Sequence, residues 1–110
     1  MQIIYRDRAK QWGEGLALLQ QATKCLEEVL GPSAGQVAAE WDRAEDGQGR
    51  LVYTLRLSDW TGAATAVFDP DELQSGSHMR SRFYRLWGDL LQIRSDKQLQ
   101  ELMGSGRGDS

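Results

Sequence analysis

The chain has 110 residues, of which 40% are hydrophobic and 26% are charged, and this suits one globular domain with one modest core. Its net charge of −3 gives no overall field that would draw it to nucleic acid or to an anionic membrane. The single cysteine, Cys25, excludes an intrachain disulfide framework and a zinc site built from several thiolates.

The N-terminal third of the chain predicts one long helix. Residues 1–7 are compatible with either a short strand or an arm, and they are too few to decide. From Trp12 onward, apolar side chains recur at spacings of three and four, so we expect an amphipathic helix over residues 8–30. Gly13 and Gly15 weaken its first turns, so a regular helix is also compatible with a start near Glu14. Gly31 suits the left-handed residue after a helix, and Pro32 cannot continue one, so the helix should end there.

The middle of the chain predicts three strands. Apolar and polar side chains alternate over residues 36–43 and 50–58, and a third short strand is expected over 63–68. Clusters of Gly, Asp and Ser between these segments are typical of turns. Because short turns force neighbouring strands to run antiparallel, the three strands should form a meander.

Beyond the strands, the sequence predicts helices that begin at polar capping residues. Asp69 is suited to an N-cap, with Pro70 at the first helical position and Glu72 reaching back to the cap. Residues 78–94, capped by Ser77, carry the strongest helical pattern in the chain. Its apolar stripe steps by four, three, four and three along Met79, Phe83, Leu86, Leu90 and Ile93.

The end of the chain predicts a separate short helix and a tail. Ser95 with Gln98 resembles a further cap, after which Leu99, Leu102 and Met103 form the apolar side of a last helix. We expect residues 1–103 to form a single α+β domain and residues 104–110 to be a disordered tail.

The expected fold is a three-stranded antiparallel meander with two main helices on one face, in the order α-β-β-β-α, followed by the short C-terminal helix. The predicted core consists of apolar residues from both helices and all three strands. These are Trp12, Leu16, Leu19, Leu26, Trp41, Tyr53, Leu55, Leu57, Phe68, Phe83, Leu86 and Leu90.

The helix over residues 78–94 is apolar around about half of its circumference, more than one sheet contact uses. Tyr84, Trp87 and Leu91 are the surplus, and Trp60 adds a large apolar group at a turn. Clustered exposed aromatic groups usually mark an interface, so we expect a homodimer that uses these four residues. In a competing arrangement, the short last helix folds back and covers part of this surface within one chain.

The same helix is locally basic. Arg80, Arg82 and Arg85 are candidates for phosphate contacts, which makes nucleic-acid binding by helix 78–94 the alternative function. The simpler interpretation, which we favour, is a solvated flank on which Arg85 can pair with Asp89 four residues later. The acidic residues at 45–46 and 69–72 are equally good partners for these arginines, within the chain or between two copies.

The order helix, three strands, helix is similar in topology to two nucleic-acid-binding groups. Double-stranded-RNA-binding domains share it, but the lysine cluster that begins their second helix is absent here. Small nucleoid-associated proteins of the YbaB type resemble residues 49–73, where a hairpin runs into the Asp69-Pro70 helix start. The resemblance implies nucleic-acid binding for the alternative function and identifies no family.

No motif for chemistry is present. His78 is the only histidine and has no recognisable triad around it, and there is no glycine-rich phosphate loop. We expect no cofactor, no metal site and no catalytic residue. No apolar run approaches the about 20 residues that span a bilayer, and residues 1–10 lack the apolar segment of a secretory signal, so we expect a cytoplasmic protein. The expected function is a non-enzymatic protein-interaction or regulatory domain, with an enzymatic role left open.

Overall fold

Four strands form one sheet whose spatial order follows the chain: β1 (Gln2–Tyr5), β2 (Ala38–Glu45), β3 (Leu51–Asp59) and β4 (Gly62–Phe68). The computed structural model describes residues 1–11 and 13–108 and, within these ranges, every side chain except those of residues 13, 14 and 104–108. The strands β2, β3 and β4 pair antiparallel, so the predicted meander is confirmed, as is the α+β class.

The first strand, β1, extends this meander to a mixed four-stranded sheet. It runs parallel to β2, with Ile3 opposite Ala39 and Tyr5 opposite Trp41. Two neighbouring parallel strands need a long crossover connection between them. The helical segment between the end of β1 and the start of β2 provides this connection. Four residues carry too weak a pattern to predict this strand, because the hydrogen bonds that stabilise it come from β2, more than 30 residues away.

The crossover contains two helices and not the single helix that was expected. These are α1 (Asp7–Lys10) and α2 (Gly13–Leu30), and a 3₁₀ segment, η1 (Gly31–Gln36), leads into β2. The first helix ends at Lys10 and the second begins at Gly13, where glycine lowers the helix propensity. The predicted end of the helix is confirmed, because Gly31 has a φ of 56°, in the left-handed region where a Cβ is costly.

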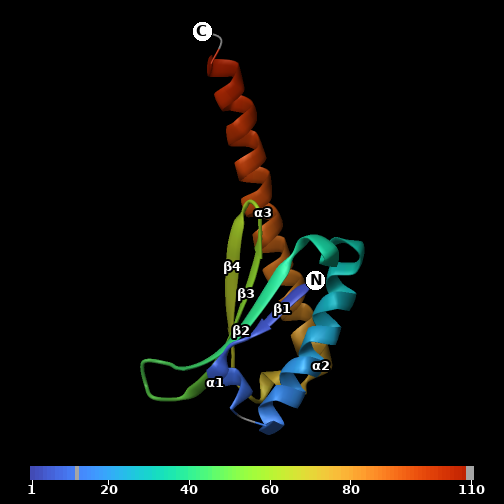
Figure 1. The fold of residues 1–110 in the computed structure, drawn as a ribbon, viewed down its shortest axis with the longest axis vertical. Helices are drawn as coiled ribbons and strands as arrows, with labels where there is room; N and C mark the ends of the chain where they lie inside the picture. The colour runs from blue at the N-terminus through green and yellow to red at the C-terminus, as the bar shows by residue number, and fades with distance from the viewer. Residues whose placement is uncertain (12, 109–110) are drawn as a thin grey trace.

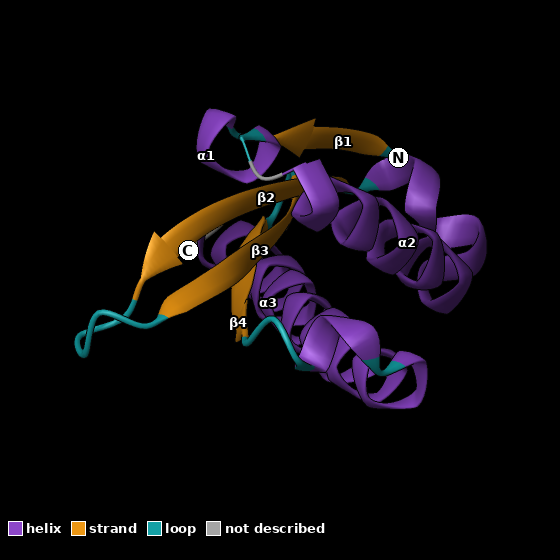
Figure 2. Ribbon diagram, turned by 90° about the horizontal axis from the view of Figure 1, so that it is seen from below, coloured by secondary structure: helices purple, strands orange, loops and turns teal. Residues whose placement is uncertain are grey.

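Both main helices, α2 and α3 (Gly76–Gly108), cover the same face of the sheet, as predicted (Figure 2). Trp41 on β2 lies between them and is fully buried. Its ring centroid lies 5.9 Å from that of Phe68 on β4 and 6.4 Å from that of Phe83 on α3. The Phe68 and Phe83 rings meet edge to face at 5.8 Å, a favoured arrangement for aromatic pairs.

The predicted core is confirmed for the residues that lie between the sheet and these two helices. The buried members are Leu19, Leu26, Trp41, Tyr53, Leu55, Leu57, Phe68, Phe83, Leu86 and Leu90. Leu16, near the start of α2, is only half-buried, and Trp12 lies outside the described residues.

The short helix predicted at Asp69 is reduced to one 3₁₀ turn, η2 (Glu72–Gln74). Asp71 takes the N-cap position, and no side chain makes a capping hydrogen bond there. The prediction that Asp69 caps a helix is therefore wrong, although the Glu72 carboxylate does accept a hydrogen bond from the Asp69 backbone N–H at 3.1 Å. Because η2 ends only one residue before α3 begins, no room is left for a longer helix.

The helix α3 runs without interruption from Gly76 to Gly108 and leaves the sheet half-way along its length (Figure 1). The predicted caps at Ser77 and Ser95 and the separate last helix are therefore wrong. Ser95 and Asp96 lie within the helix, where the Gln92 side-chain amide donates to the Asp96 carboxylate at 3.0 Å. A capping sequence does not end a helix when neither proline nor glycine follows it, and the next glycine is Gly104.

The predicted tail begins within this helix. The backbone is helical as far as Gly108, and residues 109–110 lie outside the described residues. Disorder of residues 104–110 stays a prediction.

Candidate interaction surface

One side of α3 carries large apolar side chains that the rest of the chain leaves exposed. We call Tyr84, Leu91, Leu99 and Leu102 the exposed stripe; their exposed fractions are 55%, 40%, 56% and 72%. The core-facing side chains Phe83, Leu86 and Leu90 point the opposite way and are buried. The helix is thus apolar on two sides, and the sheet covers only one of them.

The point at which α3 leaves the sheet is fixed by a polar contact at the β3–β4 turn. The Arg94 guanidinium donates to the Asp59 carboxylate at 2.7 and 3.1 Å, and the Asp59 side chain is fully buried. Burial opposes ionisation of this carboxyl group, but hydrogen bonds from Thr61 and the charge of Arg94 outweigh it, so the pKa of Asp59 lies below its ordinary value.

The backbone of the same turn comes very close to the helix. A Cβ on Gly62 would lie 2.8 Å from Cγ2 of Ile93, which is closer than carbon atoms normally approach. After Arg94, every described side chain of α3 is exposed. Residues 95–108, which we call the α3 extension, project beyond the sheet (Figure 1).

A groove lies between α2 and the first turns of α3. It has a volume of about 1040 Å³, and its α3 side runs from Gly76 to Tyr84. Leu18 and Cys25 line it from α2. Burial raises the pKa of the Cys25 thiol, which keeps it protonated and poorly nucleophilic at neutral pH. The groove is therefore better suited to contact with an apolar partner than to thiol chemistry.

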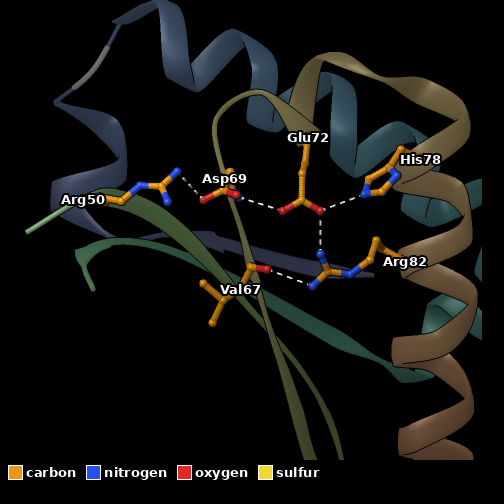
Figure 3. Close-up of polar contacts among 6 residues, drawn as sticks. All are labelled: Arg50, Val67, Asp69, Glu72, His78 and Arg82. Atoms are coloured by element: carbon orange, nitrogen blue, oxygen red, sulfur yellow. Dashed lines mark hydrogen bonds and ion pairs between the residues drawn. The ribbon is translucent and has the colours of Figure 1, made fainter. Parts of the chain in front are cut away.

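The three candidate phosphate-binding arginines are not brought together. Arg82 is turned toward the sheet, where it donates to the Glu72 carboxylate at 2.6 Å and to the Val67 carbonyl at 2.8 Å (Figure 3). Its guanidinium also lies 4.6 Å from the centre of the Phe68 ring. Arg82 thus joins α3 to the edge strand β4.

Glu72 is the centre of this polar cluster. Its carboxylate accepts from Arg82, from His78 at 2.9 Å and from the backbone N–H of Asp69 (Figure 3). Burial opposes its ionisation, but these hydrogen bonds and the charge of Arg82 outweigh burial and lower the pKa of Glu72. The cluster holds η2 and the start of α3 against β4, so its contacts stabilise the fold.

The other two arginines lie on different parts of the helix. Arg80 pairs with Glu28 of α2 at 2.9 Å, at the rim of the groove. Arg85 is exposed, and no ion pair forms between it and Asp89 or any other described side chain. The predicted pairing of Arg85 with Asp89 is therefore wrong.

The four predicted interface residues also separate. Tyr84 and Leu91 belong to the exposed stripe, whereas Trp87 is half-buried against the core, with the Arg94 guanidinium 5.4 Å from its ring centre. Trp60 is 64% exposed, but its turn meets Ile93, which lies about 200° around the helix from Leu91. Trp60 therefore lies away from the stripe.

Sequence reasoning missed the length of the exposed stripe. The sequence pattern predicts a separate last helix for Leu99 and Leu102, but the continuous α3 carries them away from the sheet. The signal that could have found them is the absence of any helix-breaking residue between Asp89 and Met103.

Other kinds of site receive no support from the described residues. They contain no group of three or more His, Cys, Asp or Glu side chains arranged to hold a metal ion. Among the described helices, none is both long and apolar enough to cross a membrane. No family model matches the chain, and no curated protein or solved structure shows significant similarity to it.

Proposed function

We propose that this protein is a non-enzymatic interaction domain that self-associates through the exposed stripe of α3. The observation that carries the proposal is the combination of four exposed apolar side chains on one side of a single helix that continues beyond the sheet. Scattered exposed apolar residues need no explanation, but a contiguous stripe of this kind usually marks a contact surface.

The length of the α3 extension supports the proposal. Isolated helices shorter than about 12–15 residues are marginally stable in water, and the 14 residues 95–108 fall within that range. Most helical stability in proteins comes from packing of an apolar side against a neighbour. A partner on Leu99 and Leu102 would provide such packing, which the sheet does not.

Nucleic-acid binding by helix 78–94 remains the alternative and has less support. Arg82 is occupied by Glu72 and the Val67 carbonyl, and Arg80 by Glu28, so of the three candidate arginines only Arg85 has no ion pair with a described side chain. A titration of binding to mixed nucleic acids with salt tests it, because phosphate contacts weaken steeply as the salt concentration rises.

Self-association is tested by replacing Leu102 with glutamate. We expect the wild-type chain to sediment as a dimer at micromolar concentration, and Leu102→Glu to weaken association about tenfold or more, because a carboxylate is costly to bury in an apolar contact. Gln100→Glu is the matched control, since it adds the same charge to the same exposed helix, on the side away from Leu102.

Two results would contradict the proposal. One is a wild-type chain that sediments as a monomer over the whole concentration range. The other is a dimer that both glutamate variants leave unchanged, which would place the contact on a different surface.

A further inference from the structure

Three residues of the exposed stripe, Tyr84, Leu91 and Leu102, belong to a longer pattern with the seven-residue spacing of a helix pairing surface, and Leu99 lies beside it. Positions alternate by three and four along one side of α3, and every one of them is exposed. We call this set the seam: Ser77, Ser81, Tyr84, Gly88, Leu91, Ser95, Gln98 and Leu102. Large side chains and small side chains follow one another unevenly along the seam, and this restricts how two copies of it can pack.

An antiparallel arrangement of two copies matches large residues with small ones. If the two-fold axis passes between Gly88 and Leu91, then Leu91 of one copy faces Gly88 of the other. In the same register, Tyr84 faces Ser95 and Leu102 faces Ser77. Small residues opposite large ones allow two helices to approach closely without voids.

In the same register, the groove of one copy lies opposite the α3 extension of the other. The groove runs along α3 from residue 76 to residue 84, and the residues of the second copy that face this stretch are 95–103. These are the first nine residues of the α3 extension, which carry the exposed Leu99 and Leu102 side chains. The part of the helix that lacks a neighbour thus lies over the part that borders an open groove.

Charges at the edge of the seam agree with this register. Arg80 and Glu101 lie on the same flank of α3, and antiparallel pairing brings residues of the same flank together. Arg80 of one copy then lies within one helical turn of Glu101 of the other, and the two-fold axis produces this opposite-charge pair twice. A parallel arrangement would instead bring opposite flanks of the two helices together, so Arg80 and Glu101 would not meet.

From these observations we propose that the groove between α2 and α3 binds the α3 extension of a second copy of this chain, in an antiparallel dimer centred between Gly88 and Leu91. The inference rests on the proposed self-association and adds to it the occupant, the orientation and the register. Each copy contributes one groove and one extension, so the contact closes on itself and stops at two chains.

Cross-linking of cysteine variants tests the orientation. All variants carry Cys25→Ser, and a short bismaleimide is added to the dimer. Leu91→Cys should link to itself, because two helices packed 8–10 Å apart bring these positions close beside the axis. Leu102→Cys alone should not link, because its two copies lie about 37 Å apart along the helices. A mixture of Leu102→Cys with Ser77→Cys should link.

The outcomes separate this inference from the function on which it rests. A wild-type monomer would overturn both. A dimer in which Leu102→Cys links to itself, or in which Leu91→Cys fails to link, would retain self-association and overturn the antiparallel register. Melting curves followed by circular dichroism confirm that each variant is folded before it is cross-linked.

A charge reversal gives an independent measurement. Glu101→Arg places two arginines together at each end of the dimer and should raise the dissociation constant about tenfold. Adding Arg80→Glu restores opposite charges at this contact, and with Glu28→Gln in every variant to remove the intrachain partner of Arg80 it should recover most of this loss. A double variant as weak as Glu101→Arg alone would show that these two residues do not meet.

Discussion

The hydroxyl group of Thr23 joins three elements in the middle of the core. Its one hydrogen is donated to the Leu19 carbonyl within α2, at 2.7 Å. The oxygen therefore accepts from the indole Nε1 of Trp41 at 3.0 Å and from the Tyr5 hydroxyl at 3.2 Å. Thr23 follows the apolar spacing of its helix, so the sequence placed it on the core side, but its partners on β1 and β2 are set only by tertiary packing.

Replacing Thr23 with valine should cost about 1–3 kcal/mol of stability, because the buried Trp41 N–H loses its acceptor. Thr23→Ser keeps the hydroxyl group and loses only a methyl group, so it should cost less. Urea unfolding of the two variants measures the difference. If valine and serine proved equally destabilising, packing of the methyl group and not the hydrogen bond would explain the effect.

The carboxylate of Glu72 makes the stability of the protein depend on pH. Because its folded pKa is lowered, the unfolded chain takes up the proton first as the pH falls. The stabilisation is thus fully present above the ordinary glutamate pKa of about 4.3 and is lost as the pH falls through the folded value.

We expect Glu72→Gln to cost about 1–2 kcal/mol at pH 7 and progressively less below about pH 4. Glu27→Gln, at an exposed position of α2, is the control and should change stability little at either pH. The measurement is urea unfolding at a series of pH values. A loss from Glu72→Gln that is constant from pH 7 to pH 3 would show that ionisation of Glu72 does not contribute.

Among the elements, α3 depends on its close contact with the β3–β4 turn. The turn is held by Asp59, and Gly62 allows the backbone to touch Ile93. Gly62 has a φ of 156°, at the limit of the region that favours glycine, so both the backbone and the space around it select this residue.

Gly62→Ala should destabilise the protein by about 1–3 kcal/mol, the usual cost of forcing an additional methyl group into a packed contact. Combining it with Ile93→Ala removes the opposing Cγ2 atom, so the two losses should be less than additive. Gly35→Ala is the control, because a Cβ there meets no atom within 4 Å. Thermal unfolding of the four variants gives the coupling, and strict additivity would contradict the contact.

For the whole molecule, the alternation of strands and the spacing of helices predicted which side chains lie in the core. Alternation placed Tyr53, Leu55 and Leu57 of β3 in the core, and helical spacing placed Phe83, Leu86 and Leu90 of α3 against them. The parallel pairing of β1 was not predictable, since it depends on an edge that β2 provides only after folding.

The candidate surface was predicted in part, for the same reason. Tyr84 and Leu91 followed from counting how much of the helix is apolar, and both are exposed. The separation of Trp60 and Trp87 from them depends on where the β3–β4 turn meets α3, which no local pattern determines. The continuity of α3 through Ser95 was not predicted, because the helix propensity of the neighbouring residues outweighs the capping sequence at Ser95.

The parallel pairing of β1 with β2 also determines the order in which the chain can fold. The meander joins strands through short turns, whereas Gln2 reaches Ala38 only after a loop of 36 residues has closed. Loop-closure entropy is lost before such distant contacts contribute, so we expect β1 to dock after the rate-limiting step. Ile3→Ala should then speed unfolding and leave the folding rate nearly unchanged, whereas Leu55→Ala should slow folding, and stopped-flow kinetics in urea distinguish the two.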